Sequence, residues 1–284
     1  MSAIRAAART GVARGGIELR QTFTNGQDLW GYFFPTVLLI TVTYFMRNST
    51  VPGTGFSLGA RTLPSALGMG IAFGGLATLA MQLIVEREDG TLLRAKALPH
   101  GMLSYLIGKI VVVSGMSLVA LGLQLGSGLL LVDGLSVHGV TPWLILVGIV
   151  ALGLVAVLPL GAIVGSMFTN SRNMGLVMLP LMGLIAISGI FYPIASFPGW
   201  LQGLAQVFPV YWLGLGMRSA LLPDSLAAVE IGHSWRHLET VGVLGLWAVA
   251  GLVIAPAVLR RMARRESGSS VAERRERALQ RSPR

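Results

Sequence analysis

Long apolar runs alternate with shorter polar stretches along the whole chain. Six such runs stand out, at 30–46, 64–85, 103–132, 143–168, 176–194 and 238–259. Each approaches or exceeds the roughly 17 to 25 residues that an α-helix needs to cross a bilayer. The pattern therefore predicts an all-α integral membrane protein with six transmembrane helices.

The composition supports the same class of protein. Hydrophobic residues make up 53% of the chain and charged residues 12%, whereas about a quarter of the residues of a soluble domain are charged. The chain has no cysteine, which excludes disulfide bonds and thiolate metal sites. The bilayer must therefore organise the fold.

The distribution of positive charge predicts the orientation. An even number of spans places both termini on one side of the membrane. That side would carry 18 of the 22 lysines and arginines, and the opposite loops would carry only Arg47, Arg61, Arg218 and Arg236. Because lysine and arginine accumulate on the cytoplasmic side, we expect a multi-pass protein of the cell membrane with cytoplasmic N- and C-termini.

The polar ends divide the chain into three parts. Residues 1–28 form a basic cytoplasmic arm in which Ile4, Ala8 and Val12 recur at helical spacing, so we expect an interfacial helix. A disordered arm is an equal alternative, because the glycines in this stretch lower helix propensity. Residues 29–262 form the six-span transmembrane domain. Residues 263–284 form a basic cytoplasmic tail, which we expect to be disordered and attracted to anionic lipid.

The connection between the fifth and sixth runs has an amphipathic pattern of its own. Trp200, Leu204 and Phe208 recur every four residues after a Pro-Gly pair, which predicts a short helix half sunk in the outer leaflet. We expect three further aromatic side chains at headgroup level: Tyr211, Trp212 and Trp235.

A dense cluster of charges separates the second and third runs. Four charged residues, 86–89, follow the second run directly, and Gly90 supplies the conformational freedom for a turn. A short helical segment follows until Pro99 ends it. The pattern predicts a compact helix-turn-helix at the cytoplasmic face, on which a soluble partner could act to move both spans. A plainer interpretation is that these charges only mark the end of a span.

Two stretches resemble one family of membrane proteins. The sequence Glu86-Arg87-Glu88-Asp89-Gly90-Thr91-Leu92, followed by Pro99 and Gly108-Lys109, is similar to the E-x-E-x-G-T-L…P…G-K segment of ABC transporter permeases of the type-two exporter branch. This branch includes bacterial drug and antibiotic exporters. A second stretch resembles the fifth span and outer re-entrant segment of the same family, and it comprises Pro180, 188–194, 198–201, 209–211 and Arg218.

The resemblance implies a permease subunit that works with other subunits. It implies pairing with a second permease copy, identical or closely related, and with two ABC ATPase subunits that bind ATP and magnesium. The residues that would couple this chain to the ATPase are Glu86, Glu88, Asp89, Gly90, Thr91 and Pro99. One departure from the family pattern, Leu93-Arg94-Ala95, concerns the choice of ATPase.

The chain itself lacks the phosphate-binding loop of an ATPase. There is no G-x-x-x-x-G-K-[ST] motif, and the nearest approach, from Gly101 to Gly108-Lys109, has too many intervening residues. We therefore expect no cofactor and no enzymatic activity in this chain. The expected partners are an ABC ATPase subunit, a second permease copy and membrane lipid, without nucleic acid.

Few ionisable residues fall within the apolar runs, and this separates the alternatives. A proton- or sodium-coupled secondary transporter usually places Asp, Glu or His near the membrane midplane, and no run has one at its centre. A secondary transporter or another membrane protein without an ATPase is the second hypothesis, and an intramembrane enzyme the third. His233 and His237 are four residues apart, but we expect an outer loop without metal there.

The uncharged interior favours hydrophobic or amphipathic cargo, such as drugs, antibiotics or lipid-like compounds, because a charged molecule would cross unpaired. The candidate path residues are a methionine stripe and one polar residue: Met174, Met178, Met182 and Gln82. Ordinary packing is the plainer interpretation of the methionines. Three glycine pairs at four-residue spacing predict close helix contacts: Gly70 with Gly74, Gly122 with Gly126, and Gly161 with Gly165.

Overall fold

The computed structural model describes residues 2–49, 57–132, 135, 137–170, 175–190 and 194–265. Within these residues the chain forms helices joined by turns, without a β-strand. The α-helices are α1 (Ser2–Thr24), α2 (Gly26–Met46), α3 (Leu58–Ala72), α4 (Thr78–Glu88), α5 (Thr91–Lys96), α6 (Gly101–Leu131), α7 (Thr141–Met167), α8 (Gly175–Ile187), α9 (Gly199–Val207), α10 (Pro209–Leu221) and α11 (His237–Arg265). A π-helix, η1 (Phe73–Ala77), joins α3 to α4, and three short 3₁₀-helices are η3 (Ile194–Ser196), η4 (Asp224–Val229) and η5 (Ile231–His233).

Five helical segments in the described part of the chain are long and apolar enough to cross a membrane. They cover Leu29–Met46, Leu58–Glu88, Gly101–Leu131, Thr141–Met167 and His237–Arg264. The second segment runs continuously through α3, η1 and α4. Large apolar side chains such as Phe45, Leu246 and Val253 remain exposed on these helices, as expected for surfaces that face lipid. The predicted all-α membrane fold is confirmed.

The fifth apolar run differs from the other five. Its helix, α8, has 13 residues and is shorter than a span. The Ser188 hydroxyl donates a hydrogen bond to the Ile185 carbonyl oxygen (2.7 Å), and Gly189 adopts a left-handed conformation with φ of 77°. A glycine in this conformation commonly ends a helix. The helix expected over 176–194 therefore ends early, at Ile187. The next helices along the chain are η3, α9 and α10.

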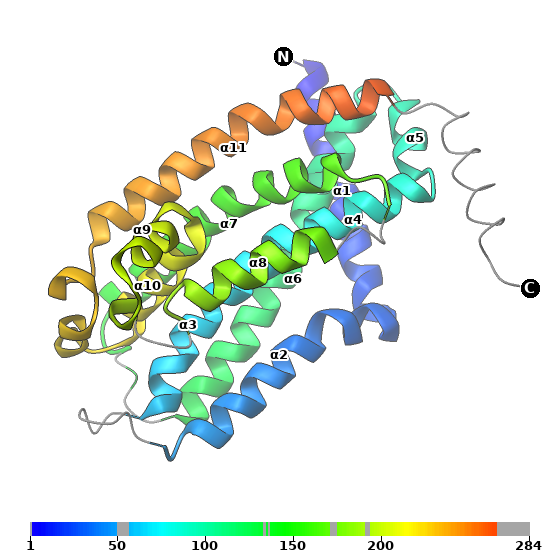
Figure 1. Cartoon of the computed structure of the whole chain (residues 1–284). Helices are drawn as coiled ribbons and strands as arrows, with labels where there is room; N and C mark the ends of the chain where they lie inside the picture. Colours follow the sequence, from blue (N-terminus) through cyan, green and yellow to red (C-terminus); the bar gives the residue numbers. More distant parts are fainter. Residues whose placement is uncertain are drawn as a thin grey trace, which may run out of the picture.

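The two described ends of the chain lie at the same end of the helix bundle. Figure 1 shows the start of α1, the short helix α5 and the last turns of α11 together, with α9 and α10 at the opposite end. Helices α5 and α11 are in contact, and α8 packs against α9 and α10. We call these two ends of the bundle the α5 end and the α10 end.

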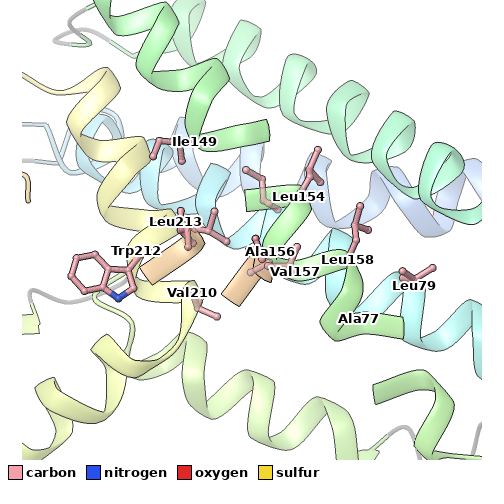
Figure 2. Packing of buried hydrophobic residues seen from close by; sticks show 14 of the residues in the cluster. Ala77, Leu79, Ile149, Leu154, Ala156, Val157, Leu158, Val210, Trp212 and Leu213 are labelled. Atoms are coloured by element: carbon pink, nitrogen blue, oxygen red, sulfur yellow. The ribbon is translucent and has the colours of Figure 1, made fainter. Parts of the chain in front are cut away.

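The apolar core is built mainly between α7, α10 and the α3–η1–α4 segment. Figure 2 shows part of it, with Ile149, Leu154 and Val157 of α7 in one buried cluster with Leu213 of α10. Helix α10 packs against both α3 and α7, and α11 covers α7. The segment between the fifth and sixth runs is therefore an integral part of the core.

Burial of α10 corrects one expectation about aromatic residues. Tyr211, Trp212 and Trp235 are buried in the protein instead of facing lipid headgroups. The indole nitrogens find protein partners: Trp212 Nε1 donates to the Gln206 carbonyl oxygen (2.7 Å), and Trp235 Nε1 donates to Asp224 Oδ1 (3.0 Å). The two tryptophans can be buried because their indole N–H groups find partners on neighbouring elements of the protein.

The predicted short helix between the fifth and sixth runs is present as α9. It begins after Pro198 and ends at Val207, and Trp200 and Leu204 on it are exposed. Ala205, on the opposite side, is buried against the core. One face of α9 thus packs on protein and the other is free for lipid.

A buried ion pair fixes α10 to its neighbours. Arg218 is only 1% exposed. Its Nε and Nη2 donate to the two carboxylate oxygens of Glu230 (2.8 and 3.2 Å). Its Nη1 donates to Ser65 Oγ of α3 (2.9 Å). Bidentate arginine–carboxylate pairs of this kind are among the stronger charged hydrogen bonds. Arg218, expected as a cation in an outer loop, is instead part of the helix packing.

Only some of the expected glycine contacts form. An added Cβ at Gly161 would lie 2.6 Å from the Leu76 carbonyl oxygen, and one at Gly165 would lie 2.7 Å from the Ala80 carbonyl oxygen. This pair brings α7 against η1 and α4, as predicted. An added Cβ at Gly122 or Gly126 meets nothing within 4 Å in the described part of the chain, so this pair forms no close helix contact there.

Substitution of glycine by alanine on α7 should therefore depend on position. Gly161→Ala places a methyl group against rigid backbone and should destabilise the protein by about 1 to 3 kcal/mol. Gly148→Ala, on the same helix, meets open space and should be neutral or slightly stabilising, because alanine favours helix. Thermal unfolding in detergent measures both, and equal midpoints for the two variants would contradict this packing.

Candidate functional site

The charged cluster predicted from the sequence forms a tight corner between α4 and α5. Helix α4 ends at Glu88, and Gly90 adopts the left-handed conformation with φ of 81° that lets α5 begin at once. Asp89 Oδ1 accepts a hydrogen bond from the Thr91 backbone N–H (2.8 Å). Pro99 follows shortly after α5 ends. The predicted helix-turn-helix is thus present between the second and third apolar segments.

The predicted coupling residues divide between the inside and the outside of this corner. Glu86 is partly buried and turns toward α6, whereas Asp89 and Pro99 are exposed. Glu86, Asp89 and Thr91 line one cleft, and Glu88, Gly90 and Pro99 do not line it. The structure therefore brings together three of the six predicted residues.

A buried lysine organises the inner part of the corner. Lys109 of α6 is 3% exposed, and its ammonium group forms ion pairs with Glu86 of α4 and with Glu18 of α1. A buried charge without a partner is strongly destabilising, whereas a paired charge is tolerated. The Lys109 contacts therefore hold α1, α4 and α6 in one arrangement.

Helix α1 reaches this corner through a face of small residues. It is a regular helix, so the alternative of a disordered arm was wrong for residues 2–24. An added Cβ at Gly11 would lie 2.7 Å from the Ser104 carbonyl oxygen, and one at Gly15 would lie 2.7 Å from the Gly108 carbonyl oxygen. The glycines that argued against a helix allow α1 to pack closely on α6.

The acidic cluster meets α1 through an acidic residue. Opposite charge alone would favour contacts of Glu86, Glu88 and Asp89 with cations of the ATPase or with the arginines of α1. In the described part of the chain, Glu86 instead binds Lys109, and α1 contributes its single acidic residue, Glu18. Sequence reasoning missed Glu18. Two features of the sequence could have indicated it. Glu18 is an isolated carboxylate in a basic segment, and the chain has only two lysines that could pair with it.

Arg87 extends the corner to a fourth helix. Its guanidinium is buried, and Nη1 donates to the carbonyl oxygens of Ser166 and Phe168 (3.1 Å each) at the end of α7. The last carbonyl groups of a helix lack partners within the helix and carry partial negative charge. Arg87 therefore caps α7 and ties it to the corner.

A polar cleft of about 620 Å³ opens between α1, α6 and the corner. Its lining residues are Thr10, Ala13, Arg14, Ile17, Glu18, Gln21, Glu86, Asp89, Thr91 and Lys109. The cleft lies at the α5 end, where Figure 1 shows α1 beside α4 and α5. Its lining offers positive and negative charges, together with hydrogen-bonding groups, to a soluble partner.

A second, apolar cavity of about 380 Å³ lies between α2, α3, η1, α6 and α8. Of the candidate path residues, Met182 lines it, whereas Met178 is partly buried against the core. Gln82 donates from Nε2 to the hydroxyl of Tyr32 (2.6 Å), which also lines the cavity. Met174 falls outside the described residues.

The two histidines considered for metal binding lie at the α10 end. Nδ1 of His233 is 2.6 Å from the Ala228 carbonyl oxygen. His237 begins α11 and lines a different hollow, beside Asp224 and Ser219. Within the described residues, no group of three or more His, Asp or Glu side chains could hold a metal ion.

Comparison with known families agrees with these features. The family described as ABC-2 family transporter protein matches residues 27–256. The chain belongs to the ABC-2 transporter family. ABC-2 proteins of this kind are multi-pass membrane subunits that work with an ATPase partner and are not themselves the ATPase. A search among curated proteins gave no significant match. The family match begins after α1, so α1 and Glu18 lie outside it.

Loss of the buried lysine should destabilise this ABC-2 protein. Lys109→Met leaves Glu18 and Glu86 facing each other without a cation, which should cost about 3 to 5 kcal/mol. Lys96→Met changes the other lysine, which is exposed on α5, and should cost less than about 1 kcal/mol. Thermal unfolding of the two variants in detergent tests this, and we expect the lower midpoint for Lys109→Met.

A rescue variant separates the charge effect from lost packing. Adding Glu18→Gln and Glu86→Gln to Lys109→Met removes all three charges, and we expect most of the lost stability to return. A triple variant as unstable as Lys109→Met would show that the lysine contributes through packing of its stem alone.

Proposed function

We propose that this chain is the permease subunit of an ATP-driven ABC exporter. A separate ATPase subunit binds ATP and magnesium and supplies hydrolysis. The permease moves hydrophobic or amphipathic compounds, such as drugs, antibiotics or lipid-like molecules, out of the cytoplasm by alternating access. Membership of the ABC-2 family supports the class of protein.

The observation that carries the proposal is the connection of the charged corner to three further helices. Lys109 joins the corner to α1 and α6, and Arg87 joins it to α7. Because breaking such buried contacts is costly, a force on α5 moves these helices together instead of unfolding the corner. The corner is therefore suited to transmit the motion of a partner to the membrane-spanning helices.

The surface of α5 and the polar cleft beside it provide the docking site for the ATPase. Leu98, directly after α5, is 61% exposed although it is apolar. Arg94 and Lys96 are exposed next to it. In the proposed complex, Leu98 packs against the ATPase, and Arg94 and Lys96 form part of the polar rim of the contact.

Positive charge at the α5 end supports its cytoplasmic location. Arg94 and Lys96 lie on α5, and Arg260, Arg261 and Arg264 lie on the last turns of α11, which contact α5. The positive-inside rule places such a cluster in the cytoplasm. The α10 end, with the amphipathic helix α9, then faces the outside of the cell membrane.

The assembly contains two permease copies, identical or closely related, and two ATPase subunits. An exposed apolar face on α8, formed by Leu176, Leu179 and Met182, is available to the second copy or to lipid. The path for the cargo includes Met174, Met178, Met182 and Gln82. The uncharged lining of the cavity around Met182 supports apolar cargo.

The orientation can be tested by cysteine labelling, because the chain has no native cysteine. Ser225 in η4 and Ala97 after α5 are both exposed. In intact cells, a membrane-impermeant maleimide should label Ser225→Cys and leave Ala97→Cys unlabelled until the membrane is opened. The reverse pattern would overturn the assigned orientation.

Coupling can be tested with two matched substitutions of exposed leucines. Leu98→Glu places a charge in the proposed ATPase contact, and Leu238→Glu places one on a residue 87% exposed at the start of α11, at the α10 end. An unpaired charge buried in an interface costs about 3 kcal/mol or more, so Leu98→Glu should weaken ATPase binding by about 100-fold or more.

The readouts are co-purification with the partner ATPase, stimulated ATP hydrolysis and export from reconstituted vesicles. Leu98→Glu should lose all three at normal membrane abundance, and Leu238→Glu should keep them. Full binding and export by Leu98→Glu would remove α5 as the coupling element, and a transport-competent complex without any ATPase would overturn the proposed function.

A further inference from the structure

Several polar side chains line one wall of the otherwise apolar cavity, and helix packing alone does not require them. It lies between α2, α3, η1, α6 and α8 (Figure 1) and has a volume of about 380 Å³. This size falls within the roughly 300 to 1,000 Å³ of typical small-molecule sites. Most of its lining is apolar, and its polar lining residues are Tyr32, Thr36, Thr78, Ser117 and Gln124.

Two glycines create the space in front of this wall. Gly70 of α3 and Gly74 of η1 both line the cavity. An added Cβ at Gly70 would lie 3.7 Å from Gln124 Oε1, and one at Gly74 would lie 3.1 Å from Ser117 Oγ. Side chains at these positions would fill the hollow beside α6. The π-helical turn η1, which contributes Phe73 and Gly74 to the lining, is a type of irregularity often found at functional sites.

Gln124 leaves a hydrogen-bonding group unused inside the bilayer region. The residue is 3% exposed, and its Nε2 has no hydrogen-bond partner within the described part of the chain. A buried amide without a partner is unfavourable, because hydrocarbon cannot replace the hydrogen bonds of water. Ser117 and Thr36, also buried, line the same cavity. The wall is therefore suited to a ligand atom that accepts a hydrogen bond.

The lining also limits the charge of the ligand. Among the described residues that line the cavity, none is Asp, Glu, Lys or Arg. A phosphate or ammonium group would enter it without a counter-charge, which is strongly unfavourable in an apolar environment. A phospholipid headgroup is thus a poor occupant, and an uncharged molecule is favoured.

The cavity lies between two helices that do not pack closely on each other. Helix α2 packs on α6, α3 and α1, whereas α8 packs on α9, α10 and η1. Met182 of α8 lines the cavity and is also half exposed. The space between α2 and α8 is therefore the direction from which a molecule dissolved in the bilayer reaches the cavity.

We propose that this cavity binds an uncharged amphipathic molecule, with a carbonyl or hydroxyl oxygen against Gln124 and an apolar body against Phe73, Met116 and Met182. The binding itself does not require an ATPase. Its role as a cargo site deepens the proposed function and rests on it. In that role, the permease selects neutral compounds directly from the membrane within a single subunit.

A photoreactive alcohol tests the site in the permease alone. Vesicles that contain the full chain are illuminated with a diazirine derivative of octanol, and adducts are located by mass spectrometry. A diazirine derivative of octane, without the hydroxyl group, serves as the comparison probe. We expect alcohol adducts on the segments around 69–78 and 116–124. Adducts spread evenly over lipid-facing helices would overturn the proposal and leave general partitioning into lipid.

Two pairs of variants identify the cavity. Gly70→Leu fills it and should reduce cavity adducts to the background level, whereas Gly122→Leu adds the same side chain to α6 in open space and should leave them unchanged. Gln124→Leu keeps the volume and removes the amide. It should lower alcohol labelling by roughly fivefold, the effect of one lost hydrogen bond, without lowering labelling by the octane probe. Equal labelling of wild type, Gly70→Leu and Gln124→Leu would refute the site.

The outcome is independent of the coupling experiment. Failure of labelling together with ATPase-dependent export by the wild-type complex overturns only the cavity. Labelling as expected together with failure of ATPase binding overturns only the exporter function, and leaves a membrane protein that binds neutral amphiphiles.

Discussion

The buried ammonium group of Lys109 is the interaction on which the arrangement at the α5 end depends. A lysine that is almost fully buried must have anionic partners, and here the two partners come from different helices, Glu18 of α1 and Glu86 of α4. One carboxylate would already neutralise the ammonium group, and the second carboxylate ties a further helix to the same group. The need to pair one charge thus fixes the relative position of three elements that are far apart in the sequence.

A buried charge also fixes the packing at the α10 end. Arg218 of α10 is buried against Glu230 and Ser65, so the return segment between the fifth and sixth apolar runs is fixed to α3. The α3–η1–α4 segment therefore takes part in a polar contact at each end, through Ser65 and Glu86. Between these contacts, Gly161 and Gly165 bring α7 against the backbone of the segment.

The sequence predicted the elements that depend on local pattern. The long apolar runs, the left-handed Gly90 and the amphipathic α9 follow from hydropathy, backbone freedom and four-residue spacing, and the structure has each of them. Partners across helices were less accessible. Glu18 and Lys109 are 91 residues apart, and nothing local to either residue identifies the other. Trp212 and Tyr211 are residue types that are common at the membrane interface, but α10 packs so that both are buried in the protein. The end of α8 was missed because apolar composition continues beyond Gly189, while the backbone turns there.

The position of the π-helical turn links the corner to the cavity. An α-helix resists bending along its length, and deformation concentrates where its regular hydrogen bonding is interrupted. In the α3–η1–α4 segment that interruption is η1, which lies between the corner at Glu86 and the contact at Ser65 and lines the cavity through Phe73 and Gly74. A movement of α4 at the corner is therefore absorbed next to the cavity. Under the proposed function, a ligand that fits the cavity in only one position of α4 changes the affinity of the corner for the ATPase, and by thermodynamic reciprocity the ATPase changes the affinity of the cavity by the same factor.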